Sequence, residues 1–194
     1  MMTRSAFFLV VLAAPAVPAL AHAADQAKLE TQLAVGDLFP RLEAEFLTGR
    51  KAVLPDAATG KVALVMMGFT YDSRYAVEKW AERFRDEFGA NKAVTFFEVP
   101  VIGGMGRMAK WFIDSGMRRG TPKDMHENVI TVYGGVGRWK TLMGFTKAQE
   151  KDAYLALLGP DGRVLWVHRG PFDEDAMADL KAAVSAAGDP GSLW

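Results

Sequence analysis

The sequence predicts an α/β domain with a mixed central sheet and helices on both faces. Three observations lead to this class. Residues 62–69 are continuously apolar, as expected of a central strand that is covered on both sides. An amphipathic helical pattern and a second apolar run, residues 93–99, follow in the order of a βαβ unit. Near the end of the chain, two strand-like segments flank the turn at residues 159–163, and a helical pattern follows them.

The first strands precede this unit. In residues 42–46, apolar side chains alternate with charged ones, which is typical of a half-buried strand. After a turn at residues 48–50, residues 52–54 are expected to pair back as a short hairpin. The central strand then ends in the junction 71–74.

The sequence indicates where the helix after this junction begins and ends. Asp72 or Ser73 is expected as its N-cap, and Gly89 as the residue just after its last turn. The helical spacing predicts one buried stripe, which consists of Val77, Trp80, Ala81, Phe84 and Phe88.

The second half of the chain alternates between helices and strands. Glycines lead into a second helix over residues 107–119, and a further strand is expected over residues 129–133. A short helix is expected at 138–142, followed by the hairpin of strands 153–158 and 164–167. The closing helix, residues 173–187, has Asp173 as its cap.

The first 23 residues have the pattern of a secretory signal peptide. Arg4 supplies a positive charge, residues 6–20 are apolar, and Ala-His-Ala at 21–23 is a small-x-small cleavage motif. We therefore expect cleavage after Ala23, a single domain over residues 24–194 and a periplasmic location. The alternative is an uncleaved N-terminus that anchors the chain in the inner membrane.

The composition excludes one class of chemistry. The chain has no cysteine, and thiol–disulfide exchange and thiol peroxidase activity both need a thiolate. Its 23 basic and 23 acidic residues balance, so no general attraction to nucleic acid is expected. His126 and His168 have no further ligands at metal-binding spacing. We predict no catalytic residue, no metal site, no cofactor and no nucleic-acid partner.

The element order is that of a thioredoxin-like domain, and the N-terminal hairpin and the inserted segment 105–119 suit its peroxiredoxin-like branch. Three stretches carry a closer likeness: Phe-Glu-Val-Pro-Val-Ile at 97–102, Trp-Phe-Ile-Asp-Ser-Gly-Met-Arg at 111–118, and residues 153–170. With them the chain resembles the family that includes the mitochondrial F-type ATP synthase assembly factor. The resemblance implies help in assembling a membrane ATPase rather than turnover of a small substrate.

The first candidate site is the junction 71–74. Exported proteins with this strand-turn-helix pattern often carry a redox-active cysteine pair here, whereas this chain has Tyr-Asp-Ser-Arg. It also lacks a proline just before Ala153, where redox-active domains of this fold place one. We therefore predict a partner contact through Tyr71, Asp72 and Arg74. The alternative is a plain helix cap beside a solvated arginine.

The second candidate is the helix within residues 105–119. Its spacing predicts one apolar face, made of Met105, Met108, Ala109, Phe112, Ile113 and Met117. A second face holds Arg107, Trp111, Asp114, Ser115 and Arg118. Of these we predict Arg107, Trp111, Asp114 and Arg118 as partner contacts. Such a helix suits an envelope protein client or a membrane surface. The alternative is an ordinary core helix.

Together these features predict an exported, non-redox protein that binds or helps to assemble an envelope or membrane protein complex. The rival prediction is a cysteine-free enzyme or small-ligand carrier with a pocket near Arg74, Glu98 and Tyr133.

Overall fold

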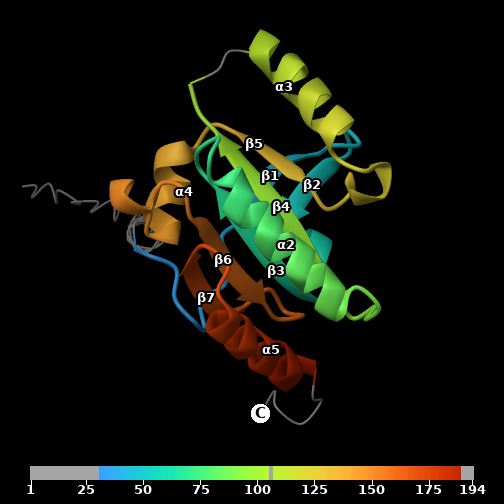
Figure 1. Cartoon of the computed structure of the whole chain (residues 1–194), viewed down its shortest axis with the longest axis vertical. Helices are drawn as coiled ribbons and strands as arrows, with labels where there is room; N and C mark the ends of the chain where they lie inside the picture. The colour runs from blue at the N-terminus through green and yellow to red at the C-terminus, as the bar shows by residue number, and fades with distance from the viewer. Residues whose placement is uncertain (1–30, 105–106, 189–194) are drawn as a thin grey trace, which may run out of the picture.

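The computed structural model describes residues 31–104 and 107–188, which are arranged around a seven-stranded mixed sheet (Figure 1). The strand order is β2-β1-β5-β4-β3-β6-β7. Strand β4 runs parallel to β3 and β5, and the other neighbours are antiparallel. The strands are β1 (Leu42–Phe46), β2 (Lys51–Leu54), β3 (Val62–Gly68), β4 (Val94–Ile102), β5 (Ile130–Tyr133), β6 (Ala153–Leu158) and β7 (Val164–Gly170).

Helices cover both faces of this sheet, as the sequence predicts. The α-helices are α2 (Arg74–Phe88), α3 (Arg107–Gly120), α4 (Val136–Met143) and α5 (Glu174–Gly188), and the 3₁₀ turns are η1 (Asp56–Ala58), η2 (Lys123–Met125) and η3 (Lys147–Gln149). Helices α2 and α5 share one hydrophobic cluster with the sheet, and α4 belongs to the cluster on the opposite face. In Figure 1, α3 stands at the end of the molecule opposite α5.

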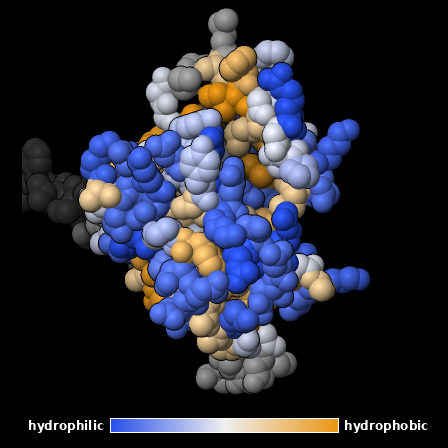
Figure 2. All heavy atoms as spheres, in the orientation of Figure 1, coloured by the Kyte–Doolittle hydropathy of each residue, from blue (hydrophilic) through white to orange (hydrophobic). Residues whose placement is uncertain are grey.

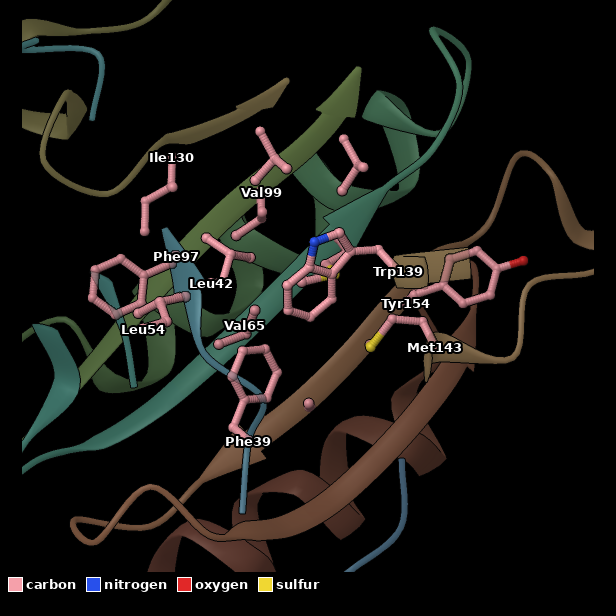
Figure 3. Packing of buried hydrophobic residues seen from close by; sticks show 14 of the residues in the cluster. Phe39, Leu42, Leu54, Val65, Phe97, Val99, Ile130, Trp139, Met143 and Tyr154 are labelled. Atoms are coloured by element: carbon pink, nitrogen blue, oxygen red, sulfur yellow. The ribbon is translucent and has the colours of Figure 1, made fainter. Parts of the chain in front are cut away.

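Strand β3 explains why one sheet supports two cores. All of its residues are buried. Ala63, Val65 and Met67 point into the cluster that contains α4, part of which Figure 3 shows. Val62, Leu64 and Met66 point into the cluster under α2 and α5. Because full burial of such a side chain contributes roughly 1.5–3 kcal/mol, this strand provides much of the driving force for folding.

Both predicted hairpins and all four predicted helices are present, with a few corrections. Strand β7 continues to Gly170, three residues beyond the predicted end. Gly89 ends α2 in a right-handed conformation and not in the left-handed one that a C′ glycine usually adopts. Phe88 is only half-buried. Asp173 does cap α5, since its carboxylate accepts the N–H of Ala176 at 3.1 Å.

Residues 33–37, which precede β1, form hydrogen bonds with residues from the last third of the sequence. The N–H of Leu33 donates to the carbonyl of Leu142 at 2.8 Å. The N–H of Gly36 donates to the carbonyl of Val164 at 2.8 Å, and the N–H of Val164 donates to the carbonyl of Asp37 at the same distance. This segment therefore pairs with the beginning of β7, the edge strand of the sheet.

The expected signal peptide and cleavage after Ala23 lie outside the described residues. Within residues 31–104 and 107–188, no helix combines the length and the apolar character that a membrane crossing needs.

Candidate functional site

The junction between β3 and α2 is held by Thr70 and Ser73. The Ser73 hydroxyl donates to the Thr70 carbonyl at 2.7 Å, and the backbone N–H of each residue donates to the other's side-chain oxygen at 3.2 Å. The Thr70 hydroxyl donates to the carbonyl of Glu150 at 2.6 Å, which ties the junction to the loop before β6. Ser73 is the N-cap residue, but its buried hydroxyl makes no cap bond to α2. It closes the turn instead.

Gly68 makes this closure possible. A Cβ atom at position 68 would lie 2.7 Å from the Ser73 hydroxyl oxygen, well inside van der Waals contact. The end of β3 therefore needs a residue without a side chain so that the buried serine can sit against it.

An aromatic and basic cluster is exposed just above this turn. We call it the Arg74 surface, and it consists of Tyr71, Arg74 and Tyr75. The guanidinium carbon of Arg74 lies 3.7 Å from the centroid of the Tyr71 ring and 4.4 Å from that of Tyr75. One Arg74 N–H donates to the Tyr75 hydroxyl at 2.5 Å. The tyrosines are 75% and 60% exposed, so both rings face solvent while they hold the arginine in place.

Asp72 has a different role from Tyr71 and Arg74. Its carboxylate forms an ion pair with Lys151 at 3.3 Å, between two largely exposed side chains. Such a pair stabilises a fold by less than about 1 kcal/mol, but it links the α2 junction to the loop before β6 a second time. Tyr75 was not among the predicted contacts, since the sequence marks it only as a residue off the buried stripe of α2.

Helix α3 is fastened to the sheet by polar groups. The Tyr133 hydroxyl donates to one oxygen of Asp114 at 2.6 Å, and Lys110 donates to the other at 3.0 Å. Lys110 also reaches Glu45 of β1 at 2.8 Å. Burial, and then the bond to Asp114, raise the pKa of Tyr133. Because Phe46 and Val132 belong to the cluster under α4, their neighbours Glu45 and Tyr133 face the other side of the sheet, where α3 lies.

The predicted division of α3 into an apolar and a polar face is wrong at Asp114 and Phe112. Asp114, predicted as a partner contact, is only 4% exposed and lies against the sheet. Trp111 and Phe112, predicted on different faces, are neighbours in solvent with 72% and 69% exposure. The physical reason is that the surface beneath α3 is polar, so the helix turns its carboxylate inward and its aromatic rings outward.

The other predicted contacts on this helix are placed only in part. Arg118 is half-buried, and its Nε donates to the carbonyl of Leu47 at 2.6 Å. It therefore fastens the end of α3 to the turn after β1. Met105 and the side chains of Arg107 and Met108 lie outside the described part of the structure.

Arg74, Glu98 and Tyr133 line neither of two cavities among the described residues. Tyr133 is bonded to Asp114, and Glu98 lies on β4 near Glu78 and Arg85 of α2. Burial raises the pKa of Glu98 to about 7, helped by the negative charge of Glu78 and opposed by Arg85.

The larger of those two cavities, about 220 Å³, lies between α2 and α5. Its charged lining groups largely neutralise one another: Arg83 pairs with Glu174 at 3.0 Å and Lys181 with Glu87 at 2.7 Å. The smaller cavity, of about 10 Å³, has room for little more than a water molecule.

Both histidines of the described residues contact other parts of the fold, His126 a backbone carbonyl and His168 two aromatic rings. The Nε2 atom of His126 lies 3.0 Å from the carbonyl of Thr121. His168 packs against Trp80 and Trp166, with ring centroids 5.4 Å and 5.5 Å away. Burial lowers the pKa of His168, and its Nε2 makes no hydrogen bond. Residues 31–104 and 107–188 contain no group of three or more His, Cys, Asp or Glu side chains arranged to hold a metal ion.

Comparison with known proteins connects this architecture to solved structures. No known family profile matches the chain. No curated protein matches it in sequence. A protein described as a putative thiol:disulfide interchange protein DsbE from Chlorobium tepidum superposes with a TM-score of 0.54 at 20% identity, over 80% of this chain and 99% of the other.

Two further structures have similar scores. BsSco, described as a member of the Sco family of cytochrome c oxidase assembly proteins, gives a TM-score of 0.53 at 15% identity, over 80% of this chain and 99% of its own. A thiol peroxidase from Chromobacterium violaceum gives 0.52 at 14% identity, over 78% and 87%. Identities this low bear on the fold alone. The chain thus has the thioredoxin-like fold of its redox-active and peroxiredoxin-like neighbours, built without a single cysteine.

Proposed function

We propose that this protein is an exported, non-redox member of the thioredoxin-like fold that binds an envelope or membrane protein and assists its assembly. The observation that carries the proposal is the Arg74 surface. It occupies the helix start where exported proteins of this pattern often carry reactive thiols, and here it presents two exposed tyrosines and an arginine.

The chemistry of this cluster suits recognition. Tyrosine and arginine are the residues enriched at the energetic centres of protein interfaces. Arg74 has five N–H donors, directs them toward the hydroxyls of Tyr71 and Tyr75, and makes no ion pair in the described part of the chain. Because its guanidinium already rests on two rings, little side-chain freedom is left to lose on binding. A client that offers a carboxylate beside an apolar group would complement it.

The class of client follows from the resemblance to the ATP synthase assembly factor family. The fold is compatible with such a role, since BsSco, a structural neighbour, belongs to a family of assembly proteins. We therefore propose an ATP synthase-like membrane complex as the client. An exported protein would meet the periplasmic side of such a complex.

A capture experiment tests the proposal. The purified chain, immobilised, is incubated with a solubilised envelope fraction, and the bound subunits are quantified. We expect replacement of Tyr71, Arg74 and Tyr75 together by alanine to weaken capture of membrane-complex subunits by about tenfold or more, as for loss of an interface centre.

The matched control is Arg138→Ala. Arg138 of α4 also lies over an aromatic ring, 5.3 Å from the centroid of Trp139, but that ring is buried. Equal capture by the triple variant and the unchanged chain would refute the Arg74 surface as the contact. Capture of proteins that belong to no membrane complex would refute the assembly role.

A further inference from the structure

Helix α3 exposes its two aromatic side chains, whereas its other described apolar residues, Ala109, Ile113 and Met117, are half-buried. Asp114 is the one fully buried side chain among its described positions 109–120, and it is held by Tyr133 and Lys110. Trp111 and Phe112 are largely exposed. Figure 2 shows apolar atoms gathered at the end of the molecule that α3 occupies. The sheet therefore does not account for the two aromatic rings.

The exposed residues of α3 form one continuous arc. With 3.6 residues per turn, Trp111, Phe112 and Arg119 fall within an arc of roughly 140°, together with Ser115 and Gly116. Trp111, Phe112, Gly116 and Arg119 are exposed in the structure, in agreement with this geometry. The arc contains no acidic residue. It combines two large aromatic rings, small residues and a cation.

The charge around this arc is strongly one-sided. Residues 107–123 contain five basic residues and one acidic residue, a net charge of +4, in a chain whose charges balance overall. The acidic residue is Asp114, which is neutralised internally by Lys110. Arg119 and Lys123 are exposed and form no ion pair among the described residues, so their charges are open to a partner.

We propose that α3 is a docking helix for the anionic surface of a lipid bilayer. Trp and Phe on one side of a basic helix enter the boundary between headgroups and acyl chains, while arginine and lysine meet the lipid phosphates. A protein groove is less well matched, since a stable protein interface buries about 800 Å² per partner and the described part of this arc offers two apolar side chains flanked by Ser115 and Gly116. The docking does not depend on the Arg74 surface.

Because the chain has no cysteine, a single introduced thiol can be labelled selectively to test membrane docking. Gly116→Cys places a single thiol on the arc, where an added Cβ meets nothing within 4 Å. Gly137→Cys, on the exposed side of α4, has the same open surroundings and is the matched control. Each full-length variant is labelled with an environment-sensitive fluorophore and mixed with vesicles of phosphatidylcholine, either alone or with phosphatidylglycerol.

We expect the fluorophore at position 116 to shift to the blue with phosphatidylglycerol vesicles only, and the one at position 137 not to shift. Trp111→Ala with Phe112→Ala in the Gly116→Cys background is expected to weaken the binding by about tenfold or more. Arg119→Glu with Lys123→Glu, both at exposed positions and so expected to leave the fold intact, is expected to abolish the shift with phosphatidylglycerol vesicles. Added salt is expected to weaken the binding.

Three results would overturn the proposal: no shift at position 116, an equal shift at position 137, or a shift that both double variants leave unchanged. Loss of vesicle binding combined with an α3-dependent capture of an envelope protein would also overturn it, in favour of a protein partner. Vesicle binding by the variant with alanine at positions 71, 74 and 75 distinguishes the Arg74 surface from α3. That variant is expected to bind vesicles normally even if the proposed function fails.

Discussion

At the scale of single residues, the α2 junction shows how a helix start is closed without a reactive side chain. Ser73 lies fully buried, with its hydroxyl against the Thr70 carbonyl and the Cα of Gly68. This position leaves no room for a nucleophile exposed to solvent. The side chains that the junction presents at the surface are instead those of Tyr71, Arg74 and Tyr75.

Gly68→Ala tests this closure. The new methyl group would approach the Ser73 oxygen to 2.7 Å, and we expect a loss of about 1–3 kcal/mol in the free energy of unfolding. Ser73→Ala alone removes a buried hydrogen-bonded hydroxyl and is expected to cost about 1–2 kcal/mol. Because the second change removes the atom that the first one meets, the double variant should lose less than the sum. Chemical denaturation of the four proteins measures this, and strict additivity would contradict the contact.

At the scale of elements, α3 differs from the other helices in how it is held. Helices α2 and α5 are fixed by apolar stripes in one cluster, whereas α3 depends on Asp114, Tyr133, Lys110 and Glu45. A buried carboxylate such as that of Asp114 stabilises only when its hydrogen-bond partners are present. The stability of α3 therefore depends on a few hydrogen bonds.

Asp114→Ala is expected to loosen α3 without unfolding the domain. It leaves the Tyr133 hydroxyl without its carboxylate acceptor, at a cost of about 1–3 kcal/mol. Amide hydrogen exchange should accelerate across α3 and stay unchanged in α2, which has its own apolar stripe. Asp124→Ala, at an exposed position of η2, is the matched control. Equal acceleration in α2 would show that the carboxylate supports the whole fold.

The elements themselves follow from the sequence more completely than the sites do. The apolar run of β3, the stripe of α2 and the turn at residues 159–163 are local signals, and each predicted its element. The faces of α3 could not be predicted in this way, because its orientation is set by Glu45 and Tyr133, which come from distant strands. Tyr75 was missed for a different reason: it is adjacent to Arg74 in sequence, and their contact depends on side-chain conformations that the residue pattern does not specify.

At the scale of the whole molecule, two half-buried ionisable groups, His168 and Glu98, act on stability in opposite directions. His168 has a lowered pKa, so the unfolded chain binds a proton more readily and stability falls as the pH drops below the ordinary histidine value. Glu98 has its pKa raised to about 7, so the folded chain keeps a proton that the unfolded chain releases. Below pH 6.5 the two groups therefore oppose each other, and from there to about pH 7 Glu98 alone lowers the stability as the pH rises.

The contribution of Glu98 to the pH dependence of stability can be isolated with Glu98→Gln. The contribution of Glu98 is fully present below the ordinary glutamate pKa of 4.5 and is lost as the pH rises through about 7. The difference between these two values corresponds to about 3 kcal/mol. We expect the variant to match the unchanged chain near pH 4 and to exceed its stability by up to about that amount at pH 8, as measured by denaturant titration. An equal pH slope in both proteins would contradict a raised pKa at Glu98.

The pairing of residues 36 and 37 with Val164 has a consequence for the order of folding. The contact closes a loop that spans most of the chain, and such closure is slow because distant segments must first find one another. Strand β7 lies at the edge of the sheet, where unpaired backbone groups invite association between chains. The leading segment shields the beginning of that edge, and it can do so only once the last strand is in place. We therefore expect self-association to compete with folding up to the moment when the two ends of the domain meet.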